Sequence, residues 1–280
     1  MTFEILWFWR YIPCAGVQLD FDEFVIHEID GRAMLVLTRN ENKPRSKILK
    51  KHILEDSGRS FSNLKTVDFE LSVASLDRDG NFEVTRVHAF SFLLMIKTGG
   101  WIDAPVFLTH STLYEPDRNQ RHVLCKSFFP TSPSFFRELK LTLEDAQWIK
   151  SHMETALEFI EKPKFQNAMQ AMTSFHCIPF DNMQLIVAWS GLESLFAIKQ
   201  KISFRLSLCI SIFLRTDDER QAEFEKLRRS YDSRSRVAHG SSTSAKDVAD
   251  YALYTRDILR ECLVKCIETK SFPNAKELAF

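Results

Sequence analysis

The chain has 280 residues, of which 45% are hydrophobic and 26% charged, and its 37 basic side chains are balanced by 37 acidic ones. This composition is typical of a globular protein with a sizeable core. The zero net charge argues against a chain-wide attraction to nucleic acid or anionic membrane, so any such contact has to come from a local patch. The six cysteines lack the spacing of a disulfide framework, which favours free thiols and a cytoplasmic protein.

The amino terminus is apolar but lacks the pattern of a targeting or membrane segment. Glu4 and Arg10 interrupt it, and no apolar run approaches the roughly 20 residues of a spanning helix. We therefore expect no membrane contact and interpret residues 1–17 as a first strand or a hydrophobic plug.

Up to about residue 127 the pattern favours strands. Asp30-Gly31 lies between two apolar runs, which is the signature of a tight hairpin. Residues 79–81 are a second candidate turn, and the apolar run that follows, residues 82–96, is interpreted as strand-like.

The order of these segments predicts an α+β protein of two domains. A β-rich domain, a small barrel or sandwich, spans residues 1–127 and is a candidate sensor or partner-binding module. Residues 128–140 combine prolines and serines and are the predicted linker. Residues 141–280 are predicted to form a helical bundle.

Capping signals mark the helices of this second domain. Thr142 with Asp145 resembles a capping box at the start of the first helix, and Ser244 with Asp247 caps the last long one. Residues 202–214 alternate as in a strand, but their length and their helical neighbours favour a buried helix.

Four arginines precede one histidine and one glycine between Arg228 and Gly240. The spacing of Arg234 and His239 by itself says little, because chance placement gives about one or two such pairs in a chain of this composition. Gly240 is placed to cap the carboxyl end of the helix. Whether Arg234 and His239 form a site therefore depends on which face of that helix Arg234 occupies.

Arg234 lies on the apolar side of its helix. The residues that share its face, at about 100° per residue, are Phe224, Leu227, Tyr231 and Ala238. A guanidinium there needs a carboxylate, a phosphate or an interface to offset its desolvation, and Glu193, inside an otherwise apolar helix, is the candidate carboxylate. Either Arg234 and Glu193 are a structural pair and His239 only ends a helix, or these residues form a site.

Two segments, AWSGLESLF and LRRSYDSRSRVAHG, followed by a terminal helix, resemble the HEPN superfamily and most closely its Apea-like branch. The first segment supplies a Leu-Glu-x-Leu-Phe element that contains Glu193. The second supplies a Tyr-x-x-Arg-Ser-x-x-x-His-Gly block, made here of Tyr231, Arg234, Ser235, His239 and Gly240. The resemblance covers about residues 142–270.

The resemblance implies a helical bundle in which two copies pair so that both Arg–His motifs face one cleft. It implies a metal-independent endoribonuclease effector of a toxin or anti-phage defence system, with Arg234 and His239 catalytic and Glu193, Tyr231 and Ser235 in support. The expected partners are RNA, with tRNA among the candidates, and a second copy of the chain. No cofactor or metal is expected.

One departure keeps a second interpretation open. In many active members a polar Asn, Asp or His follows the arginine, where this chain has Ser235. Members without catalytic activity serve as RNA-binding or dimerisation modules. The alternative is therefore a non-catalytic module of that kind, joined to a ligand-sensing first domain.

The remaining candidates are a basic cluster and a cysteine pair. Lys226, Arg228, Arg229 and Arg236 form the candidate RNA-binding cluster, for which a solvated helix face is an equally good interpretation. Cys262 and Cys266 are four residues apart on a helix, but no second pair of ligands accompanies them, so core packing is favoured over a metal site.

Overall fold

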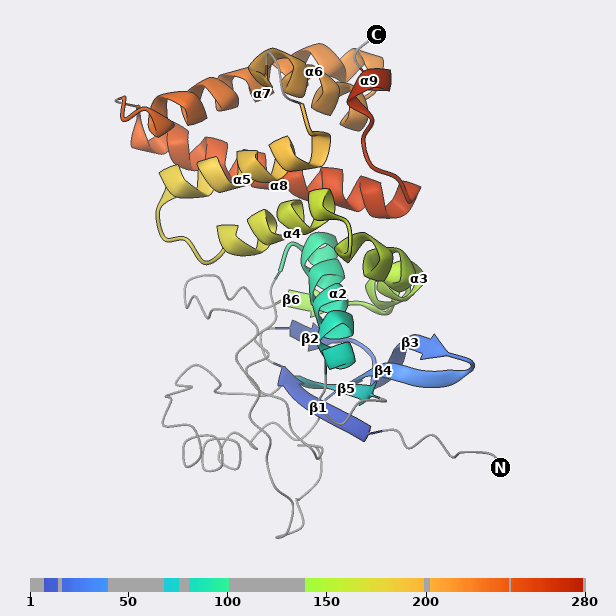
Figure 1. Cartoon of the computed structure of the whole chain (residues 1–280). Coiled ribbons are helices and arrows are strands. Elements are labelled where there is room, and N and C mark those ends of the chain that lie inside the picture. The colour runs from blue at the N-terminus through green and yellow to red at the C-terminus, as the bar shows by residue number, and fades with distance from the viewer. Residues whose placement is uncertain are drawn as a thin grey trace. The chain divides into compact units, whose positions relative to one another are not determined.

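The computed structural model shows a mixed α+β chain with a small sheet and a helical carboxyl-terminal region (Figure 1). The residues that it describes are 8–14, 17–39, 68–75, 81–100, 139–198, 202–241 and 243–278. The chain divides into two compact units, Met1–Glu154 and Thr155–Phe280. This division falls within a helix, whereas the predicted linker lies almost wholly outside the described residues.

The first unit contains a four-stranded antiparallel sheet of order β1-β5-β4-β3. Its strands are β1 (Phe8–Cys14), β3 (Glu23–Ile29), β4 (Arg32–Arg39) and β5 (Phe69–Ser75). Between β3 and β4, Asp30 and Gly31 have φ of 49° and 71°, the left-handed pair that a two-residue type I′ turn requires. The predicted hairpin is therefore confirmed. Of residues 1–17, which were interpreted as a first strand or a hydrophobic plug, Phe8–Cys14 form strand β1. A separate short sheet pairs β2 (Val17–Leu19) with β6 (Leu139–Leu141) in parallel.

The strand-like interpretation of residues 82–96 is wrong, because these residues form helix α2 (Asn81–Thr98). From Ala89 to Ile96 every residue is buried. A segment that is buried on all sides carries no apolar periodicity, so its pattern cannot separate helix from strand. Its 18 residues are the better guide, since strands rarely exceed ten residues.

Helix α3 (Leu143–Ile160) begins at the predicted capping box. The backbone N–H of Asp145 donates to Thr142 Oγ1 at 3.1 Å, and the backbone N–H of Thr142 donates to Asp145 Oδ2 at 3.2 Å. Two donors that a helix start leaves without partners are thus satisfied reciprocally. Ser244 caps α8 (Ala245–Thr269) in the related way, accepting a hydrogen bond from the backbone N–H of Asp247 at 3.4 Å.

The second unit is helical. Its elements are the end of α3, then α4 (Pro163–Phe175), α5 (Asp181–Phe196), α6 (Ile202–Leu214), α7 (Asp217–Ala238), α8 (Ala245–Thr269) and α9 (Ala275–Leu278). The ambiguous segment, residues 202–214, is a helix as predicted. Helix α5 packs against both α4 and α8, and α6 packs against α7.

Gly191 allows three of these helices to pack closely together. A Cβ on Gly191 of α5 would lie 2.8 Å from a methyl group of Leu259 on α8 and 2.9 Å from the Cβ of Ala171 on α4. Both distances are too short for real contacts, so only glycine allows α5 to sit this close to its neighbours. Among the described residues, no helix has the length and apolar content needed to cross a membrane.

Candidate functional site

Three of the predicted site residues meet between α5 and α7. The Tyr231 hydroxyl donates to Glu193 Oε1 at 3.0 Å, and Arg234 Nη2 lies 3.3 Å from the same oxygen. The guanidinium carbon of Arg234 is 5.4 Å from the centre of the Tyr231 ring, within cation–π range. We call Glu193, Tyr231 and Arg234 the α5–α7 cluster.

Packing of α7 differs from the predicted apolar face. Leu227 is buried as expected, but Ala238 is exposed, and the other buried positions of α7 are Ser230 and Ser233. Burial of Ser230 is tolerated because its hydroxyl accepts from Trp189 Nε1 at 3.2 Å and bonds the Thr255 hydroxyl at 2.8 Å. The buried side of α7 is thus turned toward the polar contacts with α5 and α8, and Arg234 lies at its edge.

The α5–α7 cluster is polar, half-buried and incompletely paired. Side chains of Arg234 and Glu193 are 23% and 26% exposed. Burial raises the pKa of Tyr231, and the Glu193 carboxylate raises it further, so the phenol stays a neutral donor. Arg234 Nε is buried and has no hydrogen-bond acceptor in the described part of the chain. One donor of Arg234 therefore stays unpaired, while Glu193 engages another part of the guanidinium.

His239 stands apart from this cluster at the carboxyl end of α7. Gly240 follows it with φ of +70°, and the backbone N–H groups of Gly240 and Ser241 donate to Val237 and Arg236 at 3.1 and 2.9 Å. These two bonds form a Schellman cap, as the glycine predicted. His239 is exposed, and the described residues supply no hydrogen bond or ion pair to its ring. Within one chain the structure thus gathers Arg234 and Glu193 but leaves the imidazole free.

The candidate RNA-binding residues do not share one face. Lys226 Nζ lies 4.0 Å above the Tyr254 ring, on the side of α7 that faces α8. Arg228 lies on the side of α7 that faces α6, and its guanidinium carbon is 6.0 Å from the centre of the Phe204 ring. Arg229 and Arg236 are exposed. The cluster that looks continuous in the sequence is therefore divided around the helix. Ser235 is half-buried beside Arg234.

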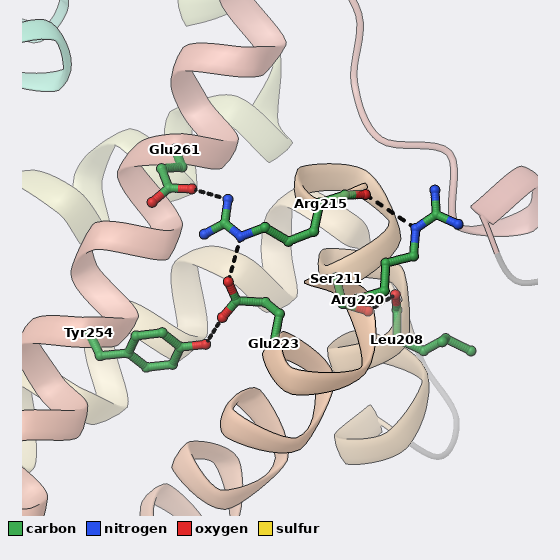
Figure 2. A network of polar contacts seen from close by, with 7 residues as sticks. All are labelled: Leu208, Ser211, Arg215, Arg220, Glu223, Tyr254 and Glu261. Carbon is green, nitrogen blue, oxygen red and sulfur yellow. Dashed lines mark hydrogen bonds and ion pairs between the residues drawn. The ribbon is translucent and has the colours of Figure 1, made fainter. Parts of the chain in front are cut away.

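A second polar network on α7 was missed by sequence reasoning. Arg215 donates through Nε to Glu223 at 2.6 Å and through Nη1 to Glu261 at 2.5 Å, and the Tyr254 hydroxyl donates to Glu223 (Figure 2). Burial opposes the charge of Arg215, but the two carboxylates outweigh it, so the pKa of the guanidinium is raised. This network joins the end of α6 to α7 and α8. Its partners are up to 46 residues apart, and no local pattern marks such a set.

The cysteine pair packs in the core. Cys262 and Cys266 are both 0% exposed, as the core interpretation predicted. Burial raises the pKa of the Cys262 thiol well above its usual range and that of Cys266 to about 12, so neither is a thiolate at neutral pH. No group of three or more metal-ligating side chains occurs among the described residues.

Comparison with known proteins finds no relative. No family model matches the chain, and no curated protein and no solved structure matches it.

Proposed function

We propose that the protein is a metal-independent endoribonuclease that cleaves RNA by attack of a 2′-hydroxyl on the neighbouring phosphate. The observation that carries this proposal is the α5–α7 cluster, in which a half-buried arginine with a free donor lies five residues before an exposed histidine. These residue types at these positions suit phosphodiester chemistry, and the HEPN-like motif agrees with it.

Each group has a role in the reaction. The imidazole of His239 takes the proton of the 2′-hydroxyl, whose oxygen then attacks the phosphorus. The bond from phosphorus to the 5′-oxygen breaks, and that oxygen receives a proton from an imidazolium. Arg234 binds the non-bridging oxygens as negative charge develops on them. The products are a 2′,3′-cyclic phosphate and a 5′-hydroxyl, and no metal is needed for the balance.

Glu193 and Tyr231 are positioning residues in this scheme. The carboxylate of Glu193 holds one edge of the Arg234 guanidinium, and the Tyr231 hydroxyl donates to the same carboxylate oxygen and so helps to fix it. An arginine that is already oriented loses less conformational freedom when it binds a phosphate. We further propose that two copies pair through the helical unit, so that exposed His239 imidazoles approach a common cleft.

The same contacts favour a second candidate function. Glu193 already pairs with Arg234, and Ser235 stands where many active relatives of this motif have Asn, Asp or His. A pair that is only structural would make the helical unit a non-catalytic RNA-binding or dimerisation module. Dependence of cleavage on His239 separates the two functions.

The test is cleavage of total RNA and tRNA by the purified full chain in EDTA, with mapping of the 3′ ends. Removing a general acid–base in His239→Ala is expected to slow cleavage by roughly 100-fold to 10,000-fold. His152→Ala, which removes a histidine of the first unit, is the matched control and is expected to cleave like the wild type. Cyclic phosphate ends made by the wild type and the control support the proposal. Equal cleavage by His239→Ala, or none by any form, contradicts it.

A further inference from the structure

An exposed aromatic ring lies beside an arginine on the α6–α7 side of the helical unit. Phe204 of α6 is 48% exposed. The Phe224 ring of α7 meets its ring edge-on, with centroids 5.4 Å apart at 79°. On the same side of α7, the guanidinium carbon of Arg228 is 6.0 Å from the centre of the Phe204 ring. We call Phe204, Phe224 and Arg228 the α6–α7 platform.

Arg228 is a half-buried cation that pairs with no carboxylate among the residues described. Its Nε is buried with no hydrogen-bond acceptor, and no carboxylate lies within ion-pair distance of it in the described part of the chain. By contrast, Arg215, Arg220, Arg234 and Arg256 of the same unit each have a carboxylate partner. A cation that is partly removed from water gains from an anionic ligand. The platform therefore offers an aromatic face and an unsatisfied positive charge side by side.

A nucleotide of a single strand matches this combination. Its base can stack on an exposed phenylalanine, and its phosphate can bind an adjacent arginine. A base in a duplex has its faces covered by its neighbours, so only an unpaired base can stack there. Arginine and phenylalanine are also enriched in protein interfaces, so the residue types alone do not favour RNA over a protein partner; the position of the platform beside the proposed reaction site does.

The platform lies close to the proposed reaction site. Arg228 and Arg234 are six residues apart on α7, which corresponds to about 9 Å along the helix axis. Their helical angles differ by about 120°, so both can be reached by one strand that crosses α7.

We infer that the α6–α7 platform is a subsite for single-stranded RNA, in which a base stacks on Phe204 and a phosphate binds Arg228. This inference rests on the proposed function and specifies its substrate as unpaired RNA. It assigns a binding role to Phe204, and it gives Arg228 a role distinct from those of Arg229 and Arg236.

The first experiment measures binding, so that it does not depend on cleavage. A fluorescently labelled eight-nucleotide oligouridylate is titrated with the full chain carrying His239→Ala, and the anisotropy is recorded. Loss of one stacked base in Phe204→Leu is expected to weaken binding by roughly 5-fold to 100-fold. Phe180→Leu is the matched control, because Phe180 is a phenylalanine of the same unit that is 65% exposed and lies at the start of α5.

Phe204→Trp keeps a stacking surface and adds a signal. It is expected to restore binding, and its fluorescence should be quenched by the oligonucleotide beyond the change that the five native tryptophans give. A thermal melt by circular dichroism establishes that each variant is folded. A Phe204→Leu chain that melts with the parent and binds as tightly as Phe180→Leu overturns the inference, as does equal affinity for the single strand and its duplex.

The role of Arg228 is tested by salt. If it neutralises one phosphate, Arg228→Gln should reduce the slope of log affinity against log salt concentration by about 0.7. Arg229→Gln removes the same charge from the neighbouring, outward position and reports the general effect of charge. The inference requires that the two side chains act together, so Phe204→Leu should weaken binding less in a chain that already carries Arg228→Gln. Equal effects of Arg228→Gln and Arg229→Gln on affinity, each independent of Phe204→Leu, overturn it.

The outcome also separates this inference from the proposed function. Stacking on Phe204 without His239-dependent cleavage leaves the subsite standing and removes the nuclease. Cleavage that depends on His239 and is indifferent to Phe204 leaves the nuclease standing and removes the subsite.

Discussion

Two sets of Arg, Glu and Tyr side chains meet at the two ends of helix α7, and they differ in how fully they are paired. Near its start, Arg215 has two carboxylate partners at 2.5–2.6 Å (Figure 2). Near its end, Arg234 pairs with Glu193 at 3.3 Å, and its buried Nε finds no acceptor among the described residues. The same residue types thus form a saturated network at one end and an open cluster at the other.

The number of carboxylate partners indicates whether an arginine mainly stabilises the fold or can also bind a ligand. An arginine whose donors are already engaged by two carboxylates has little left for a ligand, and it fixes the helices that carry those carboxylates. An arginine with one distant partner contributes less to the fold but can still bind a phosphate. A motif of residue types alone cannot distinguish these two cases, whereas distances and the number of partners can.

The largest expected effect on stability comes from the saturated network. Arg215→Ala leaves Glu223 and Glu261 facing each other without a cation, and we expect the free energy of unfolding to fall by about 3 kcal/mol, the low end for breaking a buried pair, because Glu261 is partly exposed. Arg234→Ala should cost only about 1 kcal/mol while it abolishes cleavage. Urea unfolding of both variants measures the contrast.

Arg220→Ala is the reference variant with which Arg215→Ala and Arg234→Ala are compared. Arg220 contacts Asp217, which is 83% exposed, and donates through Nε to the Arg215 carbonyl at 3.2 Å, so its loss should lower the free energy of unfolding by no more than about 1 kcal/mol. Equal losses for Arg215→Ala and Arg234→Ala would mean that both ends of α7 are structural, and the distinction drawn from their contacts would be wrong.

A smaller effect, on the pH dependence of the free energy of unfolding, is expected from a buried histidine that has a cation as its neighbour. Burial, and then the charge of Arg256, lowers the pKa of His176 to about 4 from its ordinary 6.5. Below pH 6.5 the unfolded chain binds a proton that the folded chain does not, so stability falls as the pH falls from 6.5 toward 4. Between pH 7 and pH 5 this amounts to about 2 kcal/mol.

His176→Gln isolates that contribution. Urea unfolding at pH 7 and pH 5 should show a smaller difference for His176→Gln than for the wild type, by about 2 kcal/mol. The two chains losing the same free energy over this interval would show that His176 is protonated in the folded state.

The parts of the fold that local chemistry determines were predictable. The hairpin at Asp30-Gly31, the box of Thr142 and Asp145, and the cap at Gly240 each need only residues within a few positions of one another. Helix α2 was mistaken for a strand because every residue from Ala89 to Ile96 is buried, and a segment buried on all sides has no apolar period that separates helix from strand.

The candidate site was predictable only where one residue broke a pattern. Glu193 interrupts an apolar helix and Arg234 continues a half-buried face, so each needed a partner of opposite charge, and their contact follows from that need. Arg215 gave no such signal, because it stands between two helices and its partner Glu261 is 46 residues away. In the sequence, Phe204 does not differ from the core residues around it, and only the structure shows that it is exposed.

A last, small difference in stability is expected between variants of the two tyrosines. Tyr254 donates to Glu223 inside the saturated network, whereas Tyr231 donates to Glu193 in the open cluster. Since a hydrogen bond to a carboxylate contributes more where water is excluded, Tyr254→Phe should cost about 2 kcal/mol and Tyr231→Phe about 1 kcal/mol, measured by urea unfolding. In the nuclease assay the order should reverse, because only Tyr231 holds the carboxylate that orients Arg234. A Tyr231→Phe chain that loses stability but no activity would make the α5–α7 cluster a second structural network.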